Sequence, residues 1–182
     1  PIHPSDMGLI QGSYGHPRTP PATAGREGVG TVVRVGEGVD AKVLGRPVAL
    51  DAEAGAWQEY QVQKAEDLIL FPALVPFEQL AVALLNPLTA WRLLNDFEYL
   101  NAGDVIVQNA GNSAVGQSVI QMAKKMGIRC VSLVRNPSSL NHLKALGCDE
   151  VWMDDDEVPD RMKIYSSGQG AKLAFNSVGG RS

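Results

Sequence analysis

The pattern of apolar and polar positions is clearest in residues 104–137. An apolar run at 105–107 is followed by a turn of small residues at 110–116, a helical spacing over 117–126 and a second apolar run over 128–135. This succession of strand, turn, helix and strand predicts one βαβ unit. The first run shows no polar alternation, as expected of a parallel strand that is covered on both faces.

The small-residue turn is a candidate phosphate-binding site. Glycine and alanine let the backbone approach a ligand, and the free N–H groups at the start of the following helix can bind phosphate. Only Gly111 and Gly116 are glycines, so a literal G-x-G-x-x-G is absent, and an ordinary βα connection packed with small residues is the alternative. The strand before the turn and the helix after it favour the dinucleotide interpretation.

The end of the second strand indicates which dinucleotide is bound. Folds that bind NAD usually carry Asp or Glu about 20 residues after the turn, where it holds the ribose 2′-hydroxyl. Residues 133–137 contain no carboxylate there, and Arg135 offers a planar cation that suits a 2′-phosphate. Arg135 could instead be an ordinary surface residue at a strand end. The missing acid favours NADPH over NADH.

The residues before this unit have a different character. Short apolar runs separated by glycine and proline predict a β-rich, antiparallel, barrel-like domain. We expect strands at 27–35, 46–50, 57–62 and 68–71, and a short helical turn from Ser5, as its cap, through Ile10. Helices at 76–85 and 88–97, interrupted by Asn86-Pro87, connect this domain to the βαβ unit.

Beyond residue 135 the sequence continues to predict helices and strands in alternation. We expect a helix at 138–146 that ends at Gly147, a strand at 150–153, a helix at 160–165 and a strand at 173–178. The fold class predicted is therefore α/β, a doubly wound parallel Rossmann sheet preceded by a β-rich domain. The expected domains are 1–75, the bridging helices 76–100, and the dinucleotide-binding domain 101–182.

Composition narrows the function classes. Among 182 residues, 45% are hydrophobic and 20% charged, as in ordinary globular proteins, and the net charge is −4 without a basic cluster. Nucleic acid is not an expected partner, and no apolar stretch is long enough to span a membrane. The only two cysteines, Cys130 and Cys148, are interpreted as reduced core thiols. The acidic run at 154–157 is interpreted as a solvated charge run.

Both ends of the sequence read as interrupted. It opens without Met in Pro1-Ile2-His3, and its last predicted strand is followed only by residues 179–182. We expect both domains to be incomplete, the Rossmann sheet being truncated after four strands and the barrel being partial. No targeting segment is visible.

Several motifs resemble those of the medium-chain dehydrogenase/reductase superfamily, and in particular its mitochondrial 2-enoyl thioester reductases. They are Pro4-Ser5-Asp6 and the segments 10–15, 27–29, 86–90, 108–117 and 176–180. The Gln-Gly-Ser-Tyr-Gly loop at 11–15 and the Asn-Ser turn at 112–113 are the specific ones. The resemblance covers essentially the whole chain and implies a GroES-like first domain.

The resemblance implies NADPH-dependent reduction of a trans-2-enoyl thioester, carried on acyl carrier protein or coenzyme A, in mitochondrial fatty acid synthesis. Tyr14 corresponds to the catalytic tyrosine, whose hydroxyl can bind the developing enolate and help protonation; a tyrosine packed in a loop is the alternative. Asn86 corresponds to a residue near the nicotinamide, and Arg135 to the 2′-phosphate site. The phosphate turn corresponds to Asn112, Ser113, Ala114, Val115 and Gly116. A homodimer or membership of a larger complex is implied by analogy, as is a mitochondrial location.

The same resemblance argues against a zinc site in this chain. Zinc alcohol dehydrogenases of this superfamily carry Gly-His-Glu, whereas this chain has Gly25-Arg26-Glu27, and two cysteines cannot form a four-cysteine site. His3 and Arg26 stand where close relatives carry asparagine, and residues 135–137 keep only the first arginine of an Arg-Asp-Arg pattern. Two other functions stay open: a zinc-free quinone or alkenal reductase, which would not need Tyr14, and a non-catalytic accessory subunit derived from a reductase.

Overall fold

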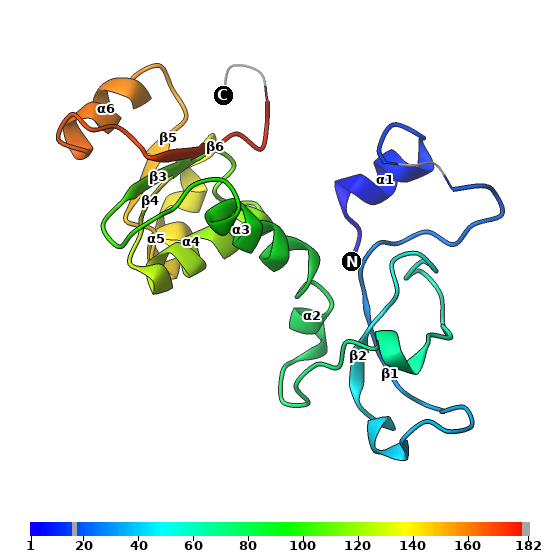
Figure 1. Ribbon diagram of the computed structural model, residues 1–182. Coiled ribbons are helices and arrows are strands. Elements are labelled where there is room, and N and C mark those ends of the chain that lie inside the picture. Colours follow the sequence, from blue (N-terminus) through cyan, green and yellow to red (C-terminus); the bar gives the residue numbers. More distant parts are fainter. Residues whose placement is uncertain (16–17, 180–182) are drawn as a thin grey trace. The chain divides into compact units, whose positions relative to one another are not determined.

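The computed structural model describes residues 1–15 and 18–179 and divides into two compact units, Pro1–Leu85 and Asn86–Ser182 (Figure 1). Residues 16 and 17 and the last glycine of the 176–180 motif lie outside the described residues. Each unit is described by itself below.

The second unit is built on a four-stranded parallel sheet. Its strands are β3 (Val105–Gln108), β4 (Arg129–Val134), β5 (Glu150–Met153) and β6 (Leu173–Phe175). Their order across the sheet is β5-β4-β3-β6. Numbered from the first strand of the unit, this is the order 3-2-1-4 with which a doubly wound dinucleotide-binding sheet begins. The predicted fold class is confirmed.

Helices cover both faces of this sheet (Figure 1). They are α3 (Leu85–Asn95), α4 (Ala114–Met126), the 3-10 turn η3 (Pro137–Ser139), α5 (Leu140–Leu146) and α6 (Val158–Tyr165). Residues of α3, α4 and α5 pack around Ile106 on one face, and Met162 of α6 packs against Val105 and Val131 on the other. Because both faces are covered, successive residues of a strand are apolar, which is why the sequence shows no alternation.

Helix α4 begins earlier than its hydrophobic spacing predicts. The hydroxyl of Ser113 accepts the N–H of Gly116 at 3.1 Å and so caps the helix, which therefore starts at Ala114 rather than at residue 117. At the end of α5, Gly147 takes a left-handed conformation with φ 102°, which confirms the predicted stop.

The first unit contains a two-stranded antiparallel sheet of β1 (Val29–Thr31) and β2 (Pro47–Ala49). The remaining elements are α1 (Pro4–Ile10), α2 (Phe77–Leu80) and the 3-10 turns η1 (Ala41–Val43) and η2 (Ala65–Asp67). Its small core joins Ala49, Phe71 and Leu80. Both strands lie inside the predicted ranges but are shorter, and the segment expected to be a strand at 68–71 contributes one bridge, Leu70 to Val48.

The strand predicted at 57–62 is not present. The apolar positions of its alternation are not buried on a common face: Tyr60 is 75% exposed and Val62 is 94% exposed. The segment is fastened by side chains instead of a ladder, since the Gln61 amide accepts the Asp51 N–H at 2.7 Å and donates to the Asp51 carbonyl at 3.0 Å. Alternation without a buried face does not specify a strand.

Three helix boundaries also differ from the prediction. The first helix begins at Pro4, so Ser5 is not its cap; the Asp6 carboxylate accepts the His3 N–H at 2.7 Å instead. The helix expected at 76–85 is reduced to the single turn of α2. Asn86-Pro87 does not interrupt a helix but lies in the first turn of α3, where proline is tolerated because its missing N–H would have no partner.

Candidate cofactor-binding site

The turn between β3 and α4 is tightly packed against its neighbours. A side chain added at Gly111 would meet the Cβ of Ser132 in β4 at 2.6 Å. One added at Gly116 would meet the carbonyl oxygens of Ala110 and Gly111, both at 2.7 Å. The two glycines therefore let the turn lie close to β4 and to the helix start. Ala110 has φ 49°, an uncommon conformation for a residue with a side chain.

The buried side-chain amide of Gln108 fixes the turn between β3 and α4 to the sheet. Gln108, the last residue of β3, is 3% exposed and donates through Nε2 to the Gly116 carbonyl at 3.0 Å and to the Ser132 hydroxyl at 2.9 Å. From the outer side, the Gln117 amide donates to the Asn112 carbonyl at 2.9 Å. The path of the turn is therefore fixed at several points.

The start of α4 faces solvent. Asn112, Ser113 and Ala114 are exposed and Val115 is half-buried, whereas Gly116 is buried. The N–H groups of Ala114 and Val115 lie in the first turn, where no preceding carbonyl of the helix can accept them. Together with the helix dipole, such groups attract an anion, and phosphate is a suitable one.

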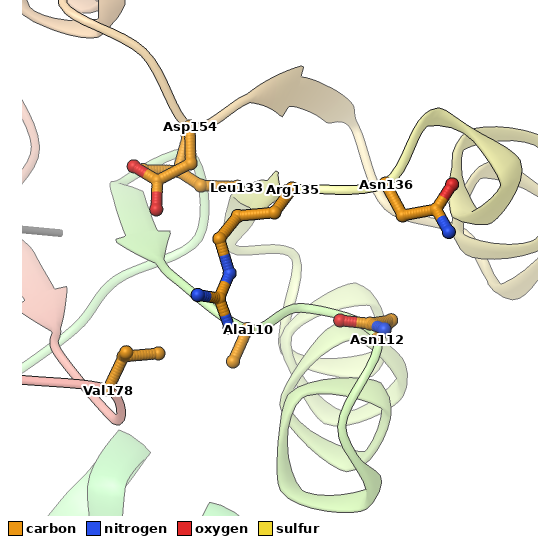
Figure 2. Close-up of a pocket in the computed structure, with 7 residues that line it drawn as sticks. All are labelled: Ala110, Asn112, Leu133, Arg135, Asn136, Asp154 and Val178. Carbon is orange, nitrogen blue, oxygen red and sulfur yellow. The ribbon is translucent and has the colours of Figure 1, made fainter.

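A pocket opens beside this turn at the carboxyl edge of the sheet, with a volume of about 190 Å³ (Figure 2). Its lining residues are Ala110, Asn112, Leu133, Arg135, Asn136, Asp154 and Val178. The Arg135 side chain extends across it, with the guanidinium near Ala110 (Figure 2). The fold thus brings together Asn112 and Arg135, which the sequence analysis singled out separately.

Asp154 is a pocket residue that the sequence analysis missed. It directly follows β5, is half-buried, and donates its backbone N–H to the Val134 carbonyl at 3.0 Å. The interpretation of 154–157 as a solvated charge run is therefore wrong for Asp154, although Asp155–Glu157 are exposed and Asp155 pairs with Arg161. Its position directly after a predicted strand could have identified Asp154, because ligands of doubly wound parallel sheets bind at the carboxyl edge.

A pair of asparagines joins the ends of β3 and β6. The Asn109 side chain is buried at 4% exposure, donates to Asn176 Oδ1 at 2.7 Å and accepts the Ser177 N–H at 2.7 Å. Asn176 Oδ1 also accepts the N–H groups of Val178 at 3.1 Å and Gly179 at 2.7 Å. We call Asn109 and Asn176 the asparagine clasp. The clasp fixes the turn after β6, and this turn places Val178 in the wall of the pocket.

Of the predicted site residues, Asn112 and Arg135 line this pocket. Ser113, Ala114, Val115 and Gly116 belong to the adjoining turn and helix start, and Asn86 and Tyr14 lie elsewhere. Asn86 stands in the first turn of α3, and Tyr14 belongs to the first unit, where 52% of its surface is exposed. The roles predicted for both residues stay predictions.

The whole chain matches known oxidoreductases. Residues 1–73 match the family described as the alcohol dehydrogenase GroES-like domain, and residues 114–182 match the zinc-binding dehydrogenase family. In both of its units the chain is therefore similar to members of the medium-chain dehydrogenase/reductase superfamily. Within it, the chain is similar to the mitochondrial enoyl-[acyl-carrier-protein] reductase of Xenopus tropicalis, at 39% identity over 188 residues that cover 100% of this chain and 54% of the relative. It thus spans about half the length of the curated relatives that it matches.

Solved structures agree with this placement. The complex of Etr1p with NADP and crotonyl-CoA is 29% identical, has a TM-score of 0.89, and is matched over 100% of this chain and 59% of its own. A putative NADPH:quinone reductase from Bacillus thuringiensis is 32% identical with a TM-score of 0.89, over 99% of this chain and 55% of its own.

The name of the second family raises the question of zinc. Within residues 1–15 and 18–179, no cluster of three or more His, Cys, Asp or Glu side chains is arranged to hold a metal ion. Cys130 and Cys148 are both buried, and Cys148 donates to the Ser132 hydroxyl at 3.3 Å. The hydrogen bond with Cys148, together with burial, raises the pKa of Cys130, so this residue is a protonated thiol at neutral pH.

None of the helices in the described part of the chain has the length and apolar character needed to cross a membrane.

Proposed function

We propose that the protein reduces trans-2-enoyl thioesters with NADPH. The observation that carries this proposal is the pocket in which Arg135 and Asn112 meet beside the capped start of α4. It occurs in a chain that resembles mitochondrial enoyl-[acyl-carrier-protein] reductases along its whole length. The activity is proposed rather than transferred, because the chain spans about half of those relatives.

The residues present fit NADPH. The exposed N–H groups at the start of α4, with the side chains of Asn112 and Ser113, suit the pyrophosphate. The guanidinium of Arg135 reaches across the adjoining pocket and suits the 2′-phosphate, which NADH lacks. Asn86 is proposed to lie toward the nicotinamide. When bound, NADPH supplies the hydride for the reaction.

The first unit would supply the stabilisation of charge on the substrate. Hydride addition to the β-carbon of an enoyl thioester moves the electrons of the double bond onto the thioester oxygen as an enolate. A hydroxyl that hydrogen-bonds this oxygen lowers the barrier, and Tyr14 is proposed to donate that bond. Its exposure leaves the hydroxyl accessible to a substrate.

The substrate class follows the same relatives. We propose an acyl chain on coenzyme A or acyl carrier protein, in agreement with the names of the mitochondrial relatives and the crotonyl-CoA held by Etr1p. A mitochondrial location is proposed on the same basis. A homodimer or a larger complex stays a prediction.

The test is a steady-state assay of NADPH oxidation with crotonyl-CoA, run in parallel with a small quinone. The quinone arm is needed because a putative quinone reductase is among the similar structures. We expect turnover of crotonyl-CoA that falls in Tyr14→Phe by about 100- to 1000-fold, the range for loss of one oxyanion donor. If the protein reduces the quinone but not crotonyl-CoA, and if Tyr14→Phe leaves the rate of quinone reduction unchanged, the result would support a quinone or alkenal reductase. Absence of NADPH binding at millimolar concentration would support the accessory-subunit hypothesis.

A further inference from the structure

A cation lies against the proposed catalytic tyrosine. The guanidinium carbon of Arg26 is 5.5 Å from the centre of the Tyr14 ring, within the range of a cation–π contact. Arg26 is half-buried. Within the described residues, the guanidinium of Arg26 makes no hydrogen bond or ion pair, and its contact with the Tyr14 ring is its one recorded interaction. Its donors are therefore available to a ligand beside Tyr14.

The backbone under each of the two side chains is anchored. A side chain added at Gly8 in α1 would meet the Tyr14 Cβ at 2.8 Å, and the Ser13 N–H donates to the Gly8 carbonyl at 2.8 Å. The loop that contains Tyr14 therefore packs closely against α1. On the other side, the Gly25 carbonyl next to Arg26 accepts the Ala56 N–H at 3.0 Å.

The carboxylate nearest in sequence does not neutralise Arg26. Glu27 is 4% exposed and its two oxygens are occupied. One accepts from His3 Nε2 at 2.8 Å, and the other accepts the N–H groups of Leu84 at 2.9 Å and Leu85 at 2.7 Å. Among the residues that the structure describes, Arg26 therefore forms no ion pair, and its positive charge lies next to the Tyr14 ring.

We infer that Arg26 is a second catalytic residue, which stabilises the negative charge on the thioester oxygen together with Tyr14. This inference rests on the function proposed above. Arginine stays protonated in proteins, so Arg26 acts by charge and hydrogen bonding, while the Tyr14 hydroxyl is the neutral donor. Donors fixed in advance where charge develops act mainly on the transition state and therefore on kcat.

The experiment compares Arg26→Gln, which removes the charge at similar length, with Arg26→Lys, which keeps it. Both are assayed at saturating NADPH with crotonyl-CoA and with the crotonyl thioester of N-acetylcysteamine, which has no phosphate. Tyr14→Phe and the double variant Tyr14→Phe/Arg26→Gln complete a double-mutant cycle, which measures the coupling between the two side chains. The thermal unfolding midpoint of each variant is measured as the control for folding.

We expect Arg26→Gln to lower kcat about 10- to 100-fold with both thioesters, with KM changed less than threefold, and Arg26→Lys to recover part of the rate. The double variant should lose less than the product of the single losses, because both side chains act on one oxygen. A loss confined to crotonyl-CoA would overturn the inference, since Arg26 would then bind the carrier phosphate. An unchanged kcat, or a loss that follows a fall in the unfolding midpoint, would also overturn it. Wild-type protein without thioester turnover would overturn the proposed function itself, and the inference with it.

Discussion

Replacing Arg135 by Gln tests the cofactor assignment most directly. The change removes one positive charge from the pocket and leaves intact the turn that is proposed to bind the pyrophosphate. Arg135 is exposed, so its interaction with a phosphate is screened by water and by the nearby Asp154 carboxylate. Hydrogen bonds to charged groups contribute about 1.5–3 kcal/mol, and screening favours the lower half of that range. The expected loss in NADPH affinity is therefore about 10- to 50-fold.

The assay is a fluorescence titration with NADPH and NADH in parallel. We expect the Kd for NADPH to rise in Arg135→Gln while the Kd for NADH changes less than twofold, because NADH has no 2′-phosphate. Lys125→Gln is the matched control: it removes an exposed positive charge from the last turn of α4, at the other end of that helix from the phosphate turn. Equal changes for both dinucleotides, or equal effects of the two variants, would refute the role of Arg135.

Four further changes test the rest of the site. Asp154→Asn should tighten NADPH binding two- to tenfold and leave NADH nearly unchanged in the same titration, because it removes a negative charge from the pocket. Asn109→Leu breaks the asparagine clasp; it should weaken both dinucleotides together and lower the free energy of unfolding in urea by about 1–3 kcal/mol. Gly116→Ala should destabilise the protein by about 1–3 kcal/mol, since the added methyl group meets two carbonyl oxygens; a lower thermal midpoint would show it. Ala110→Gly should stabilise it by about 0.5 kcal/mol in the same urea experiment, as relief of the positive φ outweighs the flexibility of glycine; a loss of stability would contradict this.

The parts of the fold that were predictable are those specified by local patterns. The sequence predicts β5 at its observed bounds, and β3, β4 and α4 to within a few residues. In these elements apolar residues are buried on covered faces, so hydrophobicity and conformation agree. In the first unit the segment 57–62 alternates without a buried face, and side-chain hydrogen bonds to distant backbone decide its path. Such bonds leave no local signal.

The candidate site divides in the same way. The phosphate turn and Arg135 are recognisable because they follow strands at a known spacing. The asparagine clasp joins residues 67 apart in the sequence, and Asp154 meets Arg135 only because β5 pairs with β4. Both depend on strand order, which periodicity alone does not give.

Each strand of the parallel sheet ends in a polar side chain at the same edge. Asn109 follows β3, Arg135 follows β4, Asp154 follows β5 and Asn176 follows β6. Parallel strands place their carboxyl ends together, so four residues that are distant in sequence become neighbours of one pocket or its supporting turn. Their tasks are separable on physical grounds. The two charged residues line the pocket and are the ones predicted to set the preference between dinucleotides. The two asparagines bond to one another and to the backbone and are expected to set only the shape of the pocket wall. Selectivity and overall affinity should therefore respond to different substitutions.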